Sequence, residues 1–125
     1  SNQMATLKGS GADTFFNVTT PKWAAQAIKG AAELGWKPAH YLNSVSSSVG
    51  SVMVPAGAEN GIGVISSNYF KDPADPAWAK DAGFMAYKAW MEKNMPGENI
   101  AEGFFTSGYI HATAIEKVSS KLVMT

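Results

Sequence analysis

Apolar residues in the first half of the chain follow two alternating patterns. Three short apolar runs, at residues 13–18, 39–42 and 63–66, are typical of buried strands. A helix is predicted between the first two runs, because Thr20-Pro21 is a favourable N-terminal pair and Gly35 is a stop signal. Its apolar face has nearly the i, i+3, i+4, i+7 spacing and consists of Ala24, Ala27, Ile28, Ala31 and Leu34.

Two shorter helical segments are predicted beside these elements. Residues 4–8 read as the end of a helix stopped by Gly9, and a short helix is predicted over residues 49–53, ended by Pro55 and Gly57. Strands that alternate with helices imply a parallel sheet with helices on its faces, joined by right-handed crossovers. This half therefore predicts part of a three-layer α/β fold of the flavodoxin-like kind.

The second half of the chain has no clear strand pattern. Two Asp-Pro pairs mark a loop over residues 68–76, and Pro96-Gly97 separates two helical stretches. The first apolar stripe consists of Trp78, Ala82, Met85, Ala86, Ala89 and Trp90. The second consists of Phe105, Tyr109, Ala112, Ile115 and Val118. The sequence thus predicts an α/β part over residues 1–67, a linker over 68–76 and two C-terminal helices within 77–125.

Composition excludes several classes of function. The 125 residues suffice for one modest domain, and 46% hydrophobic with 16% charged residues suits a packed core. Net charge is zero and arginine is absent. The chain therefore lacks the basic surplus of a nucleic-acid-binding protein and the arginine side chains that form paired hydrogen bonds with bases. Without cysteine, a disulfide framework, a zinc–thiolate site and a cysteine nucleophile are excluded. No run approaches the roughly 20 apolar residues that span a bilayer.

Motifs of common enzymes are missing. Gly9-Ser-Gly11 precedes a strand, whereas a dinucleotide-binding loop follows one, and no Gly-Lys-Ser/Thr occurs. His40 is predicted to be half-buried with a hydrogen-bonded ring, and His111 to lie on a helix surface. The serine loop at residues 43–48 lacks the glycines of a strained nucleophile turn. The sequence therefore predicts no enzyme, no metal site and no cofactor.

Polar residues follow the first two predicted strands. Asn17, Thr19 and Thr20 come after the first strand, and the serine loop at residues 43–48 comes after the second. Ligands of parallel α/β sheets bind in the crevice at the carboxyl ends of the strands, where hydroxyl and amide groups orient small polar molecules. Helix capping and ligand contact are two equally weighted interpretations of these residues.

Aromatic residues are mostly predicted to pack in the core. The four tryptophans lie at helical spacing or at helix ends, and they are Trp23, Trp36, Trp78 and Trp90. Tyr69 follows the third predicted strand. It is predicted either to line a cleft or to cover the end of the sheet.

Seven short segments occur in an order and spacing that is specific as a set. They are Gly11-Ala-Asp13, residues 20–28 (Thr-Pro-Lys-Trp-Ala-Ala-Gln-Ala-Ile), residues 32–38 (Ala-Glu-Leu-Gly-Trp-Lys-Pro), Pro55-Ala-Gly57, residues 61–67, Asp72-Pro73 ahead of Trp78, and Gly108-Tyr109. With these segments, and nearly up to residue 118, the chain resembles the branched-chain amino acid receptor family of ABC-transporter solute-binding proteins.

The resemblance implies a type I periplasmic-binding fold, in which two α/β lobes joined by a hinge close over a ligand. It places this chain in the second lobe, with a hinge crossing near residues 67–73 and the last two helices packing on the first lobe. It further implies a non-enzymatic periplasmic receptor. Such a receptor delivers an amino acid or carboxylic acid to the membrane permease of its transporter.

The resemblance also implies ligand contacts in two loops. In the family, the loop after the first of these strands contacts the head group of the ligand, and here that loop contains Asn17, Thr19 and Thr20. The loop after the next strand often carries an acid that pairs with the ligand's ammonium group, but here no acid is present. An aromatic or aliphatic carboxylic acid is therefore favoured over an ordinary amino acid. The full predicted set is Asn17, Thr19, Thr20, Asn43, Ser44, Val45, Ser46 and Tyr69.

Both ends depart from the family pattern. Ser1-Asn2 reads as a tag-cleavage scar, and residues 119–125 do not continue the resemblance, so an internal fragment is expected. Two amphipathic helices without their sheet need another partner, which predicts a homo-oligomer, with domain swapping as one route. The alternative interpretation is a small flavodoxin-like domain with an enzymatic or nucleotide-binding role.

Overall fold

A computed structural model describes residues 2–123, and the chain divides into two compact units. Unit 1 comprises Ser1–Tyr69 and unit 2 comprises Phe70–Thr125. The boundary between them falls inside the predicted linker at residues 68–76. The last two residues of the C-terminal segment that departs from the family resemblance, 124 and 125, lie outside the described range.

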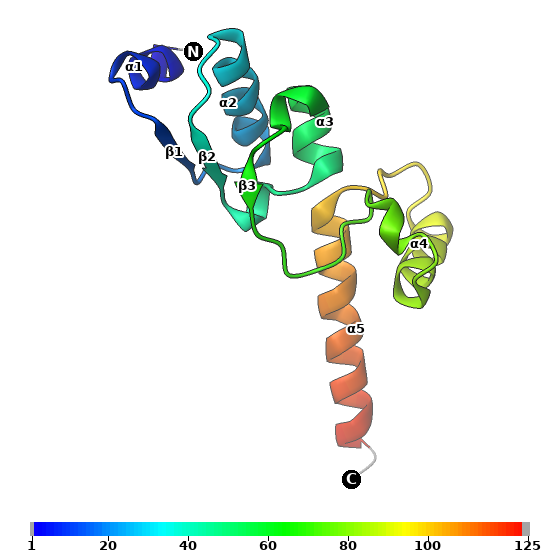
Figure 1. The fold of residues 1–125 in the computed structure, drawn as a ribbon. Helices are drawn as coiled ribbons and strands as arrows, with labels where there is room; N and C mark the ends of the chain where they lie inside the picture. Colours follow the sequence, from blue (N-terminus) through cyan, green and yellow to red (C-terminus); the bar gives the residue numbers. More distant parts are fainter. Residues whose placement is uncertain (1, 124–125) are drawn as a thin grey trace. The chain divides into compact units, whose positions relative to one another are not determined.

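Unit 1 contains a small parallel sheet, as the alternating pattern predicts (Figure 1). Its strands are β1 (Thr14–Asn17), β2 (Ala39–Leu42) and β3 (Ile65–Ser66), in the order β1-β2-β3. Helix α1 (Asn2–Gly9) precedes the sheet, and α2 (Pro21–Glu33) connects β1 to β2. The mixed α/β class is therefore confirmed.

The connection from β2 to β3 is a series of short turns. It consists of a 3₁₀ turn η1 (Ser44–Ser46), a π turn η2 (Val49–Met53), a helical turn α3 (Val54–Ala56) and a second 3₁₀ turn η3 (Ala58–Gly61). The short helix predicted at residues 49–53 is therefore present as a π turn, but the prediction that Pro55 ends it is wrong. Proline is tolerated in the first turn of a helix, because the N–H that it lacks has no partner there.

Two glycines with positive φ lie at the end of α3 and just before β3. Gly57, with φ of 86°, ends α3, and Gly63, with φ of 89°, precedes β3. A positive φ lies outside the extended region of a strand. Gly63 is therefore outside the strand, β3 contains only Ile65 and Ser66, and the longer strand predicted over residues 63–66 is wrong.

The core of unit 1 lies on one face of the sheet. It is formed by buried residues of α2, β2, η2 and α3, which are Ala24, Ala25, Ile28, Leu42, Val52 and Ala56. On the other face, Phe16, Tyr41 and Ile65 are exposed, and the rings of Phe16 and Tyr41 stack at 5.2 Å between centroids. Within unit 1 the structure thus has two layers, and the predicted third layer is not formed. No further amphipathic helix remains in this part of the chain to cover the second face.

Unit 2 contains the two predicted C-terminal helices, α4 (Ala82–Asn94) and α5 (Gly103–Val123), after a 3₁₀ turn η4 (Pro76–Trp78). They pack through aromatic contacts, with ring centroids 5.4 Å apart for Tyr87 and Tyr109 and 5.5 Å apart for Trp90 and Tyr109. Tyr87 and Met91 are the buried residues of α4. Among the described helices, none is both long and apolar enough to span a membrane.

Most residues of the predicted apolar stripes are exposed, although Phe105 and Tyr109 at the start of the α5 stripe are half-buried. Met85 and Trp90 of α4 are 57% and 42% exposed, and Ile115 and Val118 of α5 are 67% and 59% exposed. The two helices bury only the faces that they turn toward each other. The core role predicted for Trp90 is therefore wrong, and so is that of Trp23, which lies in the first turn of α2 and is 57% exposed.

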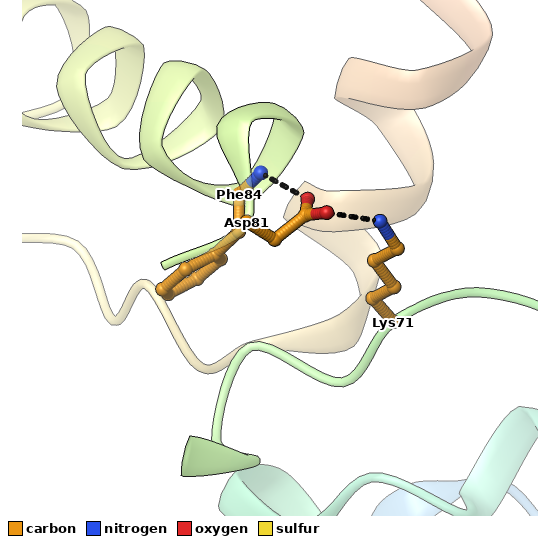
Figure 2. A network of polar contacts seen from close by, with 3 residues as sticks. All are labelled: Lys71, Asp81 and Phe84. Carbon is orange, nitrogen blue, oxygen red and sulfur yellow. Dashed lines mark hydrogen bonds and ion pairs between the residues drawn. The ribbon is translucent and has the colours of Figure 1, made fainter. Parts of the chain in front are cut away.

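Asp81 determines where α4 begins (Figure 2). Its carboxylate accepts a hydrogen bond from the N–H of Phe84 at 3.0 Å and an ion-paired hydrogen bond from Nζ of Lys71 at 2.5 Å. The same Lys71 ammonium lies 5.0 Å from the ring centre of Trp78. The hydrogen bond from Lys71, followed by that from Phe84, lowers the pKa of Asp81 below its ordinary value. The helix therefore starts after this N-cap, four residues later than the stripe that begins at Trp78.

Substitutions at Asp81 separate the cap from the ion pair. Asp81→Asn keeps an oxygen for the Phe84 N–H and loses the charge, whereas Asp81→Ala loses both. We expect the thermal unfolding midpoint, measured by the helical circular dichroism signal of the chain, to fall in the order wild type, Asp81→Asn, Asp81→Ala. Added salt should shrink the difference between wild type and Asp81→Asn, because it screens an exposed ion pair. Equal losses in the two variants would show that the cap contributes nothing.

Candidate functional site

Two polar loops lie side by side at the carboxyl end of the sheet. Because β1 and β2 are parallel and in register from Thr14↔Ala39 to Asn17↔Leu42, the chain leaves both strands at the same edge. The first loop runs from residue 18 to 20, ahead of α2, and the second runs from residue 43 to 48. This is the edge at which parallel α/β sheets bind ligands.

The carbonyl oxygen of Thr19 joins the two loops. It accepts a hydrogen bond from Oγ of Ser46 at 2.6 Å and another from Nδ2 of Asn43 at 3.0 Å. The backbone N–H of Asn43 also donates to the carbonyl of Asn17 at 3.0 Å. Ser46 is fully buried, so its hydroxyl serves this contact inside the protein. The two loops are therefore held as one unit.

Asn17 is a buried anchor for the first loop. Its Oδ1 accepts hydrogen bonds from Oγ1 of Thr19 at 2.6 Å and from the N–H of Thr19 at 3.3 Å. Its Nδ2 consequently faces Nε2 of His40, at 3.3 Å. Since an amide N–H donates, Nε2 of His40 is the acceptor, and the ring is neutral with its proton on Nδ1. The hydrogen bond predicted for the His40 ring is confirmed, but the residue is buried and not half-buried as predicted, and this burial lowers the pKa of His40.

Capping accounts for further members of the serine loop. Oδ1 of Asn43 accepts from the N–H of Ser46 at 3.0 Å and caps η1. Oγ of Ser48 accepts from the N–H of Ser51 at 3.3 Å and caps η2. Oγ of Ser47 donates to the carbonyl of Ser44 at 2.8 Å. Capping is thus observed in this loop, whereas ligand contact remains a prediction.

Four of the predicted ligand-binding residues are exposed, and they are Thr19, Thr20, Val45 and Tyr69. Thr20 is exposed and makes no side-chain cap contact with α2. Val45 is 57% exposed and Ser44 is half-buried. Tyr69, 74% exposed, lies beyond β3 at the end of unit 1 rather than in either loop. The structure brings seven of the predicted residues together at this edge, with Asn17 at the end of β1 and Thr19, Thr20, Asn43, Ser44, Val45 and Ser46 in the two loops.

The sequence did not single out two further polar residues of unit 1. Oγ of Ser66 in β3 donates to the carbonyl of Leu42 at 2.8 Å, which extends the polar edge to the third strand. The hydroxyl of Ser51, in the π turn, is buried without a hydrogen-bond partner. The position of Ser66 at the end of the third predicted strand was a usable signal. No local signal distinguishes Ser51 from its serine neighbours.

A hollow lies at the opposite end of the strands. It has a volume of about 550 Å³ and borders the segments that enter β2 and β3, including Trp36, Lys37, Glu59 and Val64. The indole N–H of Trp36 donates to the carbonyl of Ala12 at 3.0 Å, and this hydrogen bond holds the ring in place as one side of the hollow. Across residues 2–123 no group of three or more histidines and acids could hold a metal ion.

Comparisons with known proteins leave the family undetermined. No family model, curated protein or solved structure matches the chain. The site must therefore be interpreted from its own geometry.

Ser46 and Ser51 form a matched pair for testing the loop junction. Ser46→Ala removes the hydrogen bond to Thr19, and we expect the unfolding free energy of unit 1 to fall by about 0.5–1.5 kcal/mol. Ser51→Ala removes a buried hydroxyl that has no partner, so the same quantity should stay unchanged or rise. Urea unfolding followed by tryptophan fluorescence measures both. Similar losses in the two variants would contradict the junction.

His40 makes stability depend on pH. Because burial lowers its pKa below the ordinary 6.5, the unfolded chain binds a proton that the folded chain does not. Stability should be complete above about pH 6.5 and decline as the pH falls toward the lowered pKa. Urea midpoints across this range measure the decline. His40→Gln should flatten it, whereas His111→Gln, on an exposed residue of α5, should leave it in place, and the reverse result would exclude His40 as the cause.

Proposed function

We propose that the chain provides part of the ligand site of an extracytoplasmic solute-binding receptor that serves an ABC transporter. In this proposal it is not an enzyme. It works in the periplasm, and the membrane permease of the transporter is its downstream partner. The sequence resemblance to branched-chain amino acid receptors motivates the proposal, and the observation that carries it is the meeting of the two polar loops at the Thr19 carbonyl.

Rigidity of the loop pair supports a binding role. Each hydrogen bond at Thr19 joins residues far apart in sequence, so the edge is formed by the fold and not by one flexible segment. A preformed edge loses little conformational entropy when a ligand binds. The exposed Thr20 and Val45 then offer one hydroxyl and one apolar surface toward solvent.

Charge at this edge supports a carboxylate ligand without an ammonium group. Neither residues 17–20 nor residues 43–48 include an acid, so nothing in these loops pairs with an ammonium ion. Lys22 lies in the first turn of α2, whose N-terminal N–H groups favour anions. The backbone carbonyl of Thr20 accepts from the N–H groups of Trp23 and Ala24, and Pro21 has no N–H, so Lys22 holds the remaining N–H of this first turn. We therefore propose an aliphatic or aromatic carboxylic acid as the solute.

Leucine and isocaproate, which is leucine without its amino group, test this ligand class. With isotopically labelled protein, we expect isocaproate and benzoate to shift the amide NMR signals of Thr19, Thr20 and residues 44–46 in a saturable way. Leucine should shift them less, because its ammonium group meets no acid. Stronger binding of leucine than of isocaproate would contradict the proposed solute. No response to any of them would contradict a site at this edge.

Lysine variants on α2 are the matched control. Lys22→Gln removes the charge closest in sequence to the first loop and should weaken isocaproate binding about two- to fivefold, the range of an exposed charge contact. Lys29→Gln removes a charge from the second half of the same helix and should leave binding unchanged. Flavin mononucleotide tests the alternative interpretation as a nucleotide-binding domain. Its tighter binding at the same loops would favour that alternative over the receptor.

A further inference from the structure

Unit 2 contains an aromatic groove that the predicted solute site does not use. It lies between the end of α4 and the first half of α5 and has a volume of about 410 Å³. Its walls include Trp90, Phe104, Phe105, Tyr109 and, at one end, Glu116. A volume of this size falls within the range of small-molecule sites.

Packing holds the aromatic walls in place. Tyr109 contacts Tyr87 at 5.4 Å and Trp90 at 5.5 Å between ring centroids, with the rings inclined by 56° and 52°. Tyr87 is buried, and its hydroxyl donates to the carbonyl of Ile100 at 3.0 Å. Trp90 and Phe104, in contrast, are 42% and 60% exposed. The groove thus combines a fixed base with aromatic surface that a ligand can reach.

Charge distinguishes this groove from an ordinary apolar surface. Among the described residues that line it, Glu116 alone carries a charge at neutral pH. It lies seven positions after Tyr109 on α5, so the two residues share a helix face. Thr113, between them, donates its hydroxyl to the carbonyl of Tyr109 at 2.8 Å and is already engaged. Aromatic faces and one carboxylate together attract a positive charge.

We propose that this groove binds a small organic monocation, an alkylated ammonium ion whose apolar substituents pack on Trp90 and Tyr109 while its charge faces Glu116. Cation–π attraction is strongest over indole and phenol rings, which are the rings present here. A quaternary ammonium ion suits the groove best, because it carries its charge on an apolar surface and requires no hydrogen-bond acceptor. This site is independent of the carboxylate site proposed for unit 1.

Choline and its neutral isostere, in which a carbon atom replaces the quaternary nitrogen, test the proposal with the full chain. We expect choline to bind with a dissociation constant of about millimolar order and to shift the amide NMR signals of residues 104–116. The isostere has the same shape and should bind several-fold more weakly. Equal binding of the two compounds, or shifts confined to unit 1, would overturn the proposal.

Four variants define the roles of the walls. Glu116→Gln and Trp90→Leu should each weaken choline binding about two- to fivefold, the range of an exposed charge contact or cation–π contact. Glu92→Gln removes an exposed acid of α4 that pairs with Lys88 and does not line the groove, so binding should be unchanged. Trp90→Phe keeps an aromatic ring at this position and is the control for a loss of packing in Trp90→Leu. If Glu92→Gln weakens binding as much as Glu116→Gln, the attraction is non-specific and the proposal fails.

Discussion

Burial of Ile28 and Val52 is the contact on which unit 1 depends. Both side chains are fully buried, Ile28 on α2 and Val52 in the π turn, and they form one core with Leu42 of β2. Since these elements pack on the same face of the sheet, the core fixes the direction in which the chain leaves β1 and β2. The two polar loops therefore emerge together at one edge (Figure 1).

The hydrogen bonds that hold the two loops together leave fewer polar groups for a ligand. Asn17, Asn43 and Ser46 use their polar groups to hold the loops, so they offer less to a ligand than their residue types suggest. What remains accessible is a smaller set around Thr20 and Val45. A ligand at this edge would meet a rigid backbone surface with few side-chain contacts, and additional contacts would have to come from another surface that closes over it.

Within unit 2, the helix pair buries few of its aromatic and apolar residues. Tyr87 and Met91 are buried between α4 and α5, while much of the apolar surface on both helices stays exposed. The same few contacts leave the aromatic groove open beside Trp90. Its chemistry differs from that of the strand edge, because aromatic faces and a carboxylate favour cations whereas the loops of unit 1 contain no acid.

Local signals in the sequence by themselves determined where most elements lie. Thr20-Pro21 begins α2, Gly35 follows its end with φ of 63°, and the three apolar runs contain the three strands. Caps, glycine conformations and hydrophobic periods act between neighbouring residues, so they can be recognised without the fold. The shorter β3 is an exception, because the positive φ of Gly63 is visible only in the structure.

Tertiary structure alone decided which faces are buried and which polar groups are occupied. Asn17 and His40 are 23 positions apart, yet their side chains meet in the sheet, and no local pattern shows that this amide is occupied inside the protein. Likewise, the stripe of α4 reads as a core face, but only contact with α5 selects Tyr87 and Met91 for burial. Periodicity states which residues share a face, whereas burial requires a partner surface, and that partner is set by the fold.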